Sequence, residues 1–248
     1  KSNIQKMAGS SLVADASCDF TDAGTLALTE NVLTPKNLQI NLDLCKATLL
    51  DSFESLQMRA GAGAPPPASF DDYVISYMGE IIANGVEASV WSGADATGGQ
   101  FEGFLTATTG AFAVDGTVNA STASAAYTAS NIITNLQTLT ADMATDISAV
   151  LRKEDLHIYM SPKTYALYVS AVSTLGYVNA YNMNGDYAPV FEGYKIAVCN
   201  GMPNDQLVAA EKSNLFFGTD LLSDQTRIAL MDMAALDGSD NMRLVARY

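Results

Sequence analysis

The sequence predicts an α+β fold, with separate strands and amphipathic helices in one chain of 248 residues. Apolar and polar residues alternate between positions 38 and 44, as in a strand with one buried face. After Ser69, apolar residues recur at helical spacing, as in a helix with one buried stripe. With 48% apolar and 16% charged residues, the chain has the composition of a folded domain rather than of a disordered one.

The beginning of the chain lacks the features of an independent core. Residues 1–24 are small, polar and aperiodic, and their few apolar residues are isolated from one another: Ile4, Met7, Leu12 and Val13. We therefore predict an extended N-terminal arm over residues 1–24.

A projecting β-hairpin is predicted over residues 25–41. Leu26 and Leu28 share one face of its first strand, and the alternation that begins at position 38 marks its second strand. Pro35 cannot donate to a strand ladder, so the connection around it is predicted to be the tip of the hairpin.

The clearest helix is predicted over residues 69–90. Ser69 can cap its start, and Asp71 and Asp72 complement the positive end of the helix dipole in the first turn. A proline triplet just before Ser69 removes backbone donors and marks a linker. At 1.5 Å per residue the helix is about 30 Å long, so it must lie along an equally long partner.

The second half of the chain alternates helices with short strands. Apolar spacing at 132–150 predicts a second amphipathic helix, and LHIYM at 156–160 predicts a strand. Ser161 and Pro162 are typical residues for the cap and the first position of a third helix. A polar, aromatic loop follows at 177–189. Further strands are predicted at 194–200, 215–218, 227–235 and 242–248, the last two as a hairpin.

The sequence contains no motif for catalysis, for a cofactor or for a metal. Nucleophile elbows, phosphate-binding loops, zinc-protease helices and EF-hand loops need fixed residues at fixed offsets, and none of these spacings occurs. The single histidine, His157, is interpreted as a packed or surface residue. The three cysteines have no C-x-x-C spacing, which favours a reducing compartment over a disulfide framework or a zinc site. We therefore expect no enzyme, no cofactor and no metal.

The balance of charge limits the partners of this protein. Acidic residues outnumber basic residues by 27 to 13, and the net charge of -14 disfavours direct binding to duplex DNA. Residues 116–141 carry no charge, but their many Ser, Thr and Asn side chains would be costly to bury in lipid. We expect no membrane span there.

Three stretches of the sequence follow one another in a distinctive order. The first runs from CKATLLDSFES through the linker to FDDYVISYMGEIIANGVEASVWSG, and the second is the glycine-rich WSGADATGGQFEGFL. The third is LHIYMSPKTYALYVSAVS, followed by FEGYKIAVCNGMP. Together, over residues 38–248, they resemble the major capsid protein family of tailed bacteriophages, which has the Hong Kong 97-type fold. Lys195 departs from that pattern, because the family usually has proline there.

The resemblance implies a structural subunit rather than a catalyst. Residues 25–41 would be the extended loop, residues 42–110 and 225–248 a peripheral domain built on the spine helix, and residues 111–224 an axial domain. Such subunits form pentamers and hexamers of an icosahedral shell, which encloses double-stranded DNA without sequence-specific binding. The implied partners are further copies, a portal protein and decoration or scaffold proteins, with assembly in the bacterial cytoplasm and a final location in the virion capsid, not in a membrane.

Segments without a core of their own lose ordering entropy unless a neighbouring copy covers them. Lys36 is also a candidate for a covalent cross-link to an asparagine of a neighbour, as in some members of the family, although a lysine in a turn is usually a solvated charge. The predicted inter-subunit contacts are Leu12, Val13, Leu33, Pro35, Lys36, Asn37, Tyr73, Tyr77, Tyr181, Met183, Asp186 and Tyr187.

Two other interpretations stay open at this point. An encapsulin-like shell of a bacterial nanocompartment would keep the fold and change the content, although the N-terminal helix usual in such shells has no counterpart in residues 1–24. An enzyme or a secreted binding module with a mixed α+β core is the third possibility, but the sequence shows no converging set of polar residues for it.

Overall fold

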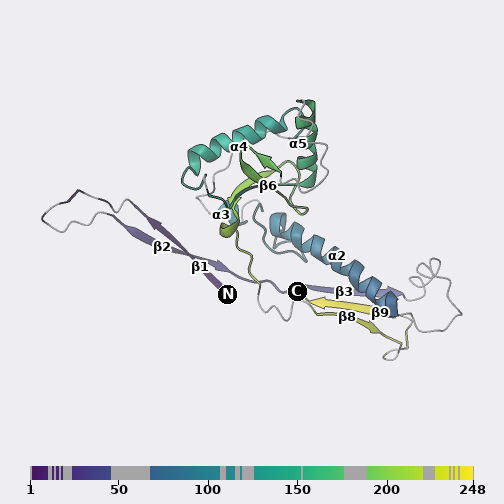
Figure 1. Ribbon diagram of the computed structural model, residues 1–248. Coiled ribbons are helices and arrows are strands. Elements are labelled where there is room, and N and C mark those ends of the chain that lie inside the picture. Colours follow the sequence, from purple (N-terminus) through teal and green to yellow (C-terminus); the bar gives the residue numbers. More distant parts are fainter. Residues whose placement is uncertain are drawn as a thin grey trace.

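The chain is described by a computed structural model that combines helices with three separate sheets (Figure 1). A two-stranded hairpin extends to one side, a long helix lies along a three-stranded sheet, and two further helices cover a four-stranded sheet. The description covers residues 2–10, 13, 15, 16, 18, 24–45, 68–106, 110–114, 118, 126–151, 153–175, 189–219, 227–234, 236, 238, 239 and 241–247.

The projecting hairpin is made of different strands from those predicted. β1 (Ser2–Gly9) pairs antiparallel with β2 (Leu26–Leu33). The prediction of a hairpin over residues 25–41 is therefore wrong in its pairing, and the extended arm predicted over residues 1–24 contains β1, which pairs with β2. The segment around Pro35 is an extended connection between β2 and the next strand rather than a hairpin tip. Short-range alternation marked two strands correctly, but it carries no information on which strands are partners.

The three-stranded sheet combines one strand from the first fifth of the chain with the last two strands of the described chain. β9 (Asn241–Arg247) lies between β3 (Gln39–Cys45) and β8 (Arg227–Asp232), and both pairings are antiparallel. The predicted strand at 38–44 and the predicted C-terminal hairpin are thus confirmed. On one face of this sheet Met242 is buried among Leu44, Leu230 and two side chains of the long helix, Val74 and Met78.

The long helix α2 spans Ala68–Ser92, which confirms the helix predicted over 69–90. Its Val74 side packs on the three-stranded sheet, whereas Trp91, near its other end, packs on the four-stranded sheet. The rings of Trp91 and Tyr159 have centroids 5.5 Å apart, and those of Trp91 and Phe104 are 5.9 Å apart. One helix therefore joins the two sheets, as Figure 1 shows.

The four-stranded sheet has helices on one face and the end of α2 on the other. Its strand order is β5-β6-β4-β7, and β4 and β6 are parallel. Ile158, Met160 and Ile196 face the helices, whereas Tyr159 and Val208 face Trp91. The bounds are α3 Ala111–Val114, α4 Ile132–Asp146, β4 Leu156–Met160, α5 Pro162–Thr174, β5 Val190–Phe191, β6 Tyr194–Val198, β7 Leu207–Glu211 and a 3-10 turn at Lys212–Asn214.

The third predicted helix begins as its sequence indicates. Ser161 is almost fully buried, and its Oγ accepts a hydrogen bond from the Thr164 amide at 3.2 Å, with Pro162 in the first turn. The second helix and the strands at 156–160 and 194–200 are also confirmed. The strand predicted at 215–218 is wrong, because within the described chain this segment joins no ladder. The division into a peripheral and an axial domain stays a prediction.

Two glycines allow α2 to contact the loops beside it at backbone distance. A Cβ atom on Gly201 would lie 2.5 Å from the Ala88 nitrogen, and a Cβ atom on Gly103 would lie 2.6 Å from the Ser89 carbonyl oxygen. Real Cβ atoms essentially never approach so closely. The second half of α2 is therefore fixed against the four-stranded sheet by packing that only glycine permits.

Candidate functional site

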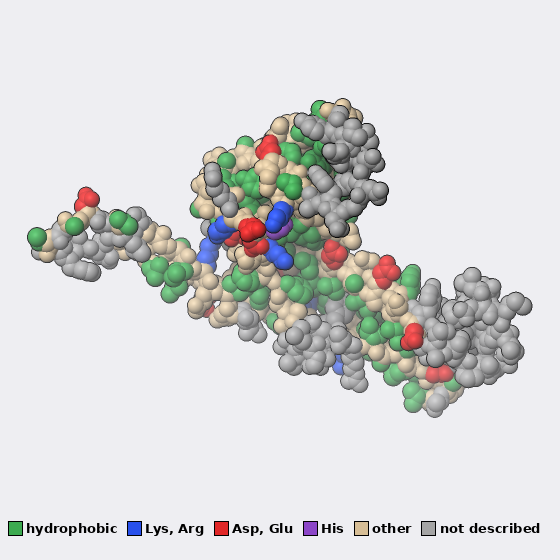
Figure 2. All heavy atoms as spheres, in the orientation of Figure 1, with side chains coloured by type: hydrophobic (Ala, Val, Ile, Leu, Met, Phe, Trp, Pro, Cys, Tyr) green, Lys and Arg blue, Asp and Glu red, His purple; other side chains and the backbone are tan. Residues whose placement is uncertain are grey.

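The projecting hairpin exposes four large apolar side chains on one face, which they share with Glu30. Residues directly opposite each other in an antiparallel pair lie on the same face, and each further residue on that face is two positions along the strand. Met7 is opposite Leu28, while Leu26 and Val32 lie two and four positions from Leu28 on the same strand. Their exposed fractions are 68% for Met7, 66% for Leu28, 58% for Leu26 and 48% for Val32. We call these four residues the apolar face of the hairpin; Figure 2 shows apolar side chains along this projection.

The opposite face of the hairpin carries both polar and apolar side chains, and near its base it lies beside the segment that leads to β8. Lys6, Ala8 and Thr29 are exposed on this face, while Leu33 is half-buried. A Cβ atom on Gly218 would lie 3.1 Å from Leu33 Cδ1, so the segment that leads to β8 passes directly beside the base of the hairpin. In that segment Phe217 contacts Phe101, with ring centroids 5.9 Å apart.

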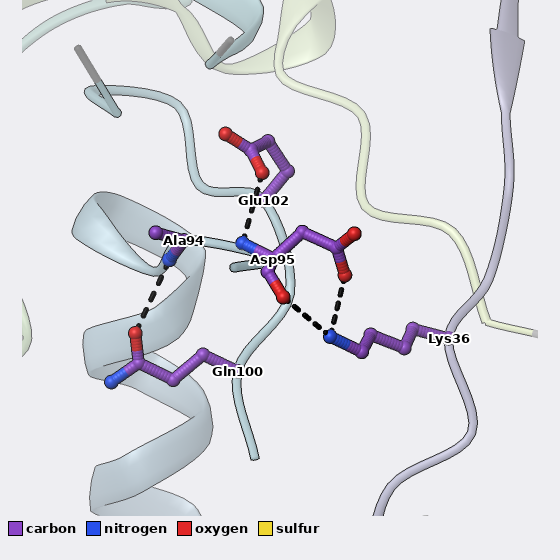
Figure 3. A network of polar contacts seen from close by, with 5 residues as sticks. All are labelled: Lys36, Ala94, Asp95, Gln100 and Glu102. Carbon is purple, nitrogen blue, oxygen red and sulfur yellow. Dashed lines mark hydrogen bonds and ion pairs between the residues drawn. The ribbon is translucent and has the colours of Figure 1, made fainter. Parts of the chain in front are cut away.

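A polar network fixes the connection between the hairpin and β3 (Figure 3). Lys36 Nζ lies 2.5 Å from Asp95 Oδ1 and donates a hydrogen bond of 3.0 Å to the Asp95 carbonyl oxygen. The Asp95 amide donates to Glu102 Oε2 at 3.0 Å, and the Ala94 amide donates to Gln100 Oε1 at 3.2 Å. Asp95 is therefore held in a loop that is itself bonded to the end of α2.

A second exposed apolar surface lies on α2. Tyr77 is 56% exposed and Ile81 is 47% exposed, and residues four apart lie on the same side of a helix. Val74 and Met78, on the other side, are covered by the three-stranded sheet. The helix is thus covered along one side only by the described part of the chain.

The predicted contact residues fall into three groups. Leu33, Pro35, Lys36 and Asn37 come together at the base of the hairpin, and all except Leu33 are exposed. Val13, in the segment joining β1 to β2, and Tyr77 on α2 are exposed, while the side chain of Tyr73 lies outside the description. Also outside the described residues are Leu12, Tyr181, Met183, Asp186 and Tyr187. Their role as inter-subunit contacts stays a prediction.

Sequence reasoning did not include the apolar face of the hairpin among the contacts. Leu26 and Leu28 were placed correctly on one face of a strand, but Met7 was interpreted as an isolated apolar residue. The available signal was that Leu26, Leu28 and Val32 recur at even spacing, interrupted at this spacing by Glu30. The pairing with β1, which adds Met7 to this face, requires the register.

Two groups elsewhere in the described chain that could take part in chemistry are His157 and Cys199. His157 Nδ1 lies 2.7 Å from the Asp155 backbone oxygen, which occupies one ring nitrogen. Burial raises the pKa of the Cys199 thiol, and the carboxylate of Glu87 raises it further, so this thiol is held in its protonated form. Among the described residues no group of acidic, histidine or cysteine side chains could hold a metal ion, and no helix is long and apolar enough to cross a membrane.

Comparison with known proteins gives structural similarity without sequence similarity. No family model matches the sequence, and no curated protein matches it. A solved structure from Mycobacterium phage Che8 aligns with 99% of this chain and 78% of its own, with 10% identity and a TM-score of 0.46. The capsid structure of Cyanophage P-SCSP1u aligns with 99% of this chain and 77% of its own, with 15% identity and a TM-score of 0.43. The mature capsid of bacteriophage PhiM1 aligns with 99% of this chain and 76% of its own, with 14% identity and a TM-score of 0.45.

The solved structures that match this chain therefore include two phage capsids. All three TM-scores are below 0.5 and all identities are 15% or lower. The function of this chain is therefore inferred from its own geometry.

Proposed function

We propose that this protein is a structural subunit of a tailed-phage capsid and acts by assembling with copies of itself. The observation that carries the proposal is the hairpin of β1 and β2, which projects from the body with Met7, Leu26, Leu28 and Val32 exposed on one face. An isolated two-stranded hairpin is at best marginally stable in water. Exposed apolar side chains on such a hairpin are typical of a surface that a partner covers.

The free energy available from covering this face is substantial. Full burial of one large apolar side chain contributes about 1.5–3 kcal/mol. The four side chains are between 48% and 68% exposed, so roughly half of that contribution is still unrealised in the single chain. Covering all four then contributes about 3–6 kcal/mol before the costs of association. Because each subunit would both offer a hairpin and cover one, this contribution recurs at every contact of a ring.

The covering surface would belong to a second copy of the same chain. Tyr77 and Ile81 give α2 an exposed apolar strip, and the loop after α2 carries Phe101 close to the exposed Phe217. These surfaces lie on the body, whereas the apolar face of the hairpin extends beyond it. Such a head-to-tail contact uses two different patches and can close into rings.

In its finer form the proposal is a Hong Kong 97-type subunit that forms pentamers and hexamers of an icosahedral shell around double-stranded DNA. Portal, decoration and scaffold proteins would be its other partners, and assembly would take place in the bacterial cytoplasm. The net charge of -14 supports a wall that does not adsorb the packaged DNA strongly. No catalytic role is part of this proposal. A cross-link through Lys36 also stays a prediction, because its ammonium group is bonded to Asp95 of the same chain.

The direct test is to express the full chain and measure the size of the purified protein by sedimentation velocity and negative-stain electron microscopy. The proposal expects closed particles of uniform diameter. A chain that stays monomeric at millimolar concentration would refute it. A denaturing gel of the particles tests the cross-link, since a single monomer band excludes it.

The content of such particles separates the capsid from the encapsulin-like alternative. Particles isolated from infected cells should contain double-stranded DNA, which nuclease digestion after particle opening would detect. Particles that contain a folded enzyme instead of DNA would favour a nanocompartment shell.

A further inference from the structure

In the described chain, the base of the hairpin is held by Leu33 beside Gly218, by the buried Leu38 and by Lys36. Residues 34–38 between β2 and β3 belong to no ladder, so their own backbone does not fix an angle. Each hairpin strand has eight residues, so the projection is about 26 Å long at 3.3 Å per residue. A small rotation at its base therefore moves its far end by many ångströms.

Lys36 is placed where it can fix this angle. It lies within the connection, and its ammonium group contacts both the carboxylate and the carbonyl oxygen of Asp95. Asp95 does not move freely, because its loop is tied down by Glu102 and Gln100 and by a hydrogen bond from the Gly103 amide to the Gly93 carbonyl at 2.9 Å. Lys36 thus connects the hairpin to a rigid part of the body.

A positive charge beyond the end of α2 is also electrostatically favourable. The carboxyl end of a helix carries partial negative charge, which a nearby cation stabilises. α2 has 25 residues and no basic residue in its last turn. Lys36 supplies a positive charge from outside the helix, three residues beyond its last residue, Ser92, at the position of Asp95.

We infer that the Lys36–Asp95 pair is a charge-dependent hinge lock, which holds the hairpin at one angle relative to α2 and releases it when either charge is removed or screened. The pair is partly open to water, since the side chains of Lys36 and Asp95 are 34% and 66% exposed. Such exposed pairs contribute little to overall stability and weaken in salt. The lock would therefore set the geometry of the hairpin without adding much to the stability of the fold.

The test measures the distance from the hairpin to α2 in the unassembled full chain. One spin label is attached to the native Cys18, which is exposed in the segment joining β1 to β2, and the other to a cysteine introduced by Glu80→Cys on the exposed side of α2. Cys45→Ser and Cys199→Ala remove the other thiols. Double electron–electron resonance then gives the distribution of distances.

The expected result is a narrow distribution that broadens in Lys36→Met, in Asp95→Asn and at about 1 M salt, where the Debye length is about 3 Å. Met keeps the apolar stem of the lysine and removes only the charge. The exchanged pair Lys36→Asp with Asp95→Lys should restore the narrow distribution. Lys163→Met, which removes an exposed lysine on α5, should leave the distribution unchanged.

Equal widths in the parent protein and in Lys36→Met would overturn the inference, as would equal broadening by Lys163→Met. The consequence for assembly rests on the proposed function, but the lock does not, because the distance is measured in single chains. If the parent protein forms no particles and the distribution still broadens in Lys36→Met, the function is refuted and the lock is retained. If particles form and the width of the distribution does not depend on Lys36, the lock is refuted and the proposed function is retained.

Discussion

Removing two leucines from the apolar face of the hairpin should weaken assembly without weakening the fold. The double variant Leu26→Thr with Leu28→Thr keeps strand propensity, because threonine is favoured in strands. Both side chains are more than half exposed in the single chain, at 58% and 66%. The surface that they lose is therefore mostly surface that a partner would cover, not surface that supports the subunit itself.

The size of the effect follows from the remaining apolar area. Full burial of a leucine contributes about 1.5–3 kcal/mol, and roughly 60% of it is still available here, or about 1–2 kcal/mol per side chain. Threonine retains part of this contribution, so the pair of substitutions costs about 2 kcal/mol per contact. This corresponds to about a thirtyfold weaker contact. The protein concentration at which particles appear should rise by about the same factor, because each subunit contributes one hairpin.

A matched control tests whether the effect depends on the position of the two leucines or only on the loss of exposed leucine side chains. Leu175 and Leu236 are 61% and 72% exposed, and neither belongs to the hairpin. Leu175→Thr with Leu236→Thr removes the same chemical groups at nearly the same exposure. Light scattering against protein concentration measures the onset of assembly, and circular dichroism during heating shows whether each variant is folded. The reasoning is wrong if the hairpin variant assembles at the parent concentration, or if both double variants are impaired to the same degree.

Three further predictions concern the fold and the thiols. Gly201→Ala should lower the free energy of unfolding by about 1–3 kcal/mol and the Tm by several degrees, because its Cβ would lie 2.5 Å from the α2 backbone. Gly98→Ala should leave the Tm unchanged, because its Cβ would meet nothing within 4 Å. Ser161→Ala should lower the urea midpoint by an amount that corresponds to about 1–2 kcal/mol, because it removes the cap of α5 and leaves the Thr164 amide without its partner, whereas Ser161→Thr should retain most of the stability. Native protein should react at Cys18 and Cys45, which are exposed, and only slowly at Cys199, whose pKa is raised by burial and by Glu87, so its alkylation should need a higher pH or denaturant. Mass spectrometry of alkylated peptides checks this order, and equal labelling of all three thiols in the native protein would contradict it.

Local patterns in the sequence predicted most elements of the fold. Ser161 and Pro162 mark the start of α5 because a cap and a fixed φ are local requirements. The alternation after position 38 marks β3 for a similar reason, since one residue in two faces the core. These signals need no knowledge of distant parts of the chain.

The pairing of the strands could not be predicted in the same way. β3 pairs with β9 almost 200 residues later, and β2 pairs with β1 rather than with β3. Alternation specifies the face of each strand but not its neighbour. Pro35 indicated a turn because proline has no backbone N–H to donate. A connection that joins no ladder needs no donor at this position either, so the residue fits both structures. The contact of Lys36 with Asp95 likewise depends on the tertiary course of the chain.

The sequence of the hairpin also bears on how it can associate. A two-stranded ribbon has two open edges, which tend to pair with other strands, and it has two faces. Lys6 on β1 and Asn31 on β2 lie on one face, and Glu30 lies on the other face among the exposed apolar side chains. Such charged or amide groups along a strand discourage pairing at an edge. The large apolar side chains that are exposed lie on one face, at Met7, Leu26, Leu28 and Val32. Association through the face buries these side chains, whereas association through an edge leaves them in water. We therefore expect the hairpin to lie flat on a neighbouring surface rather than to extend the sheet of a neighbour.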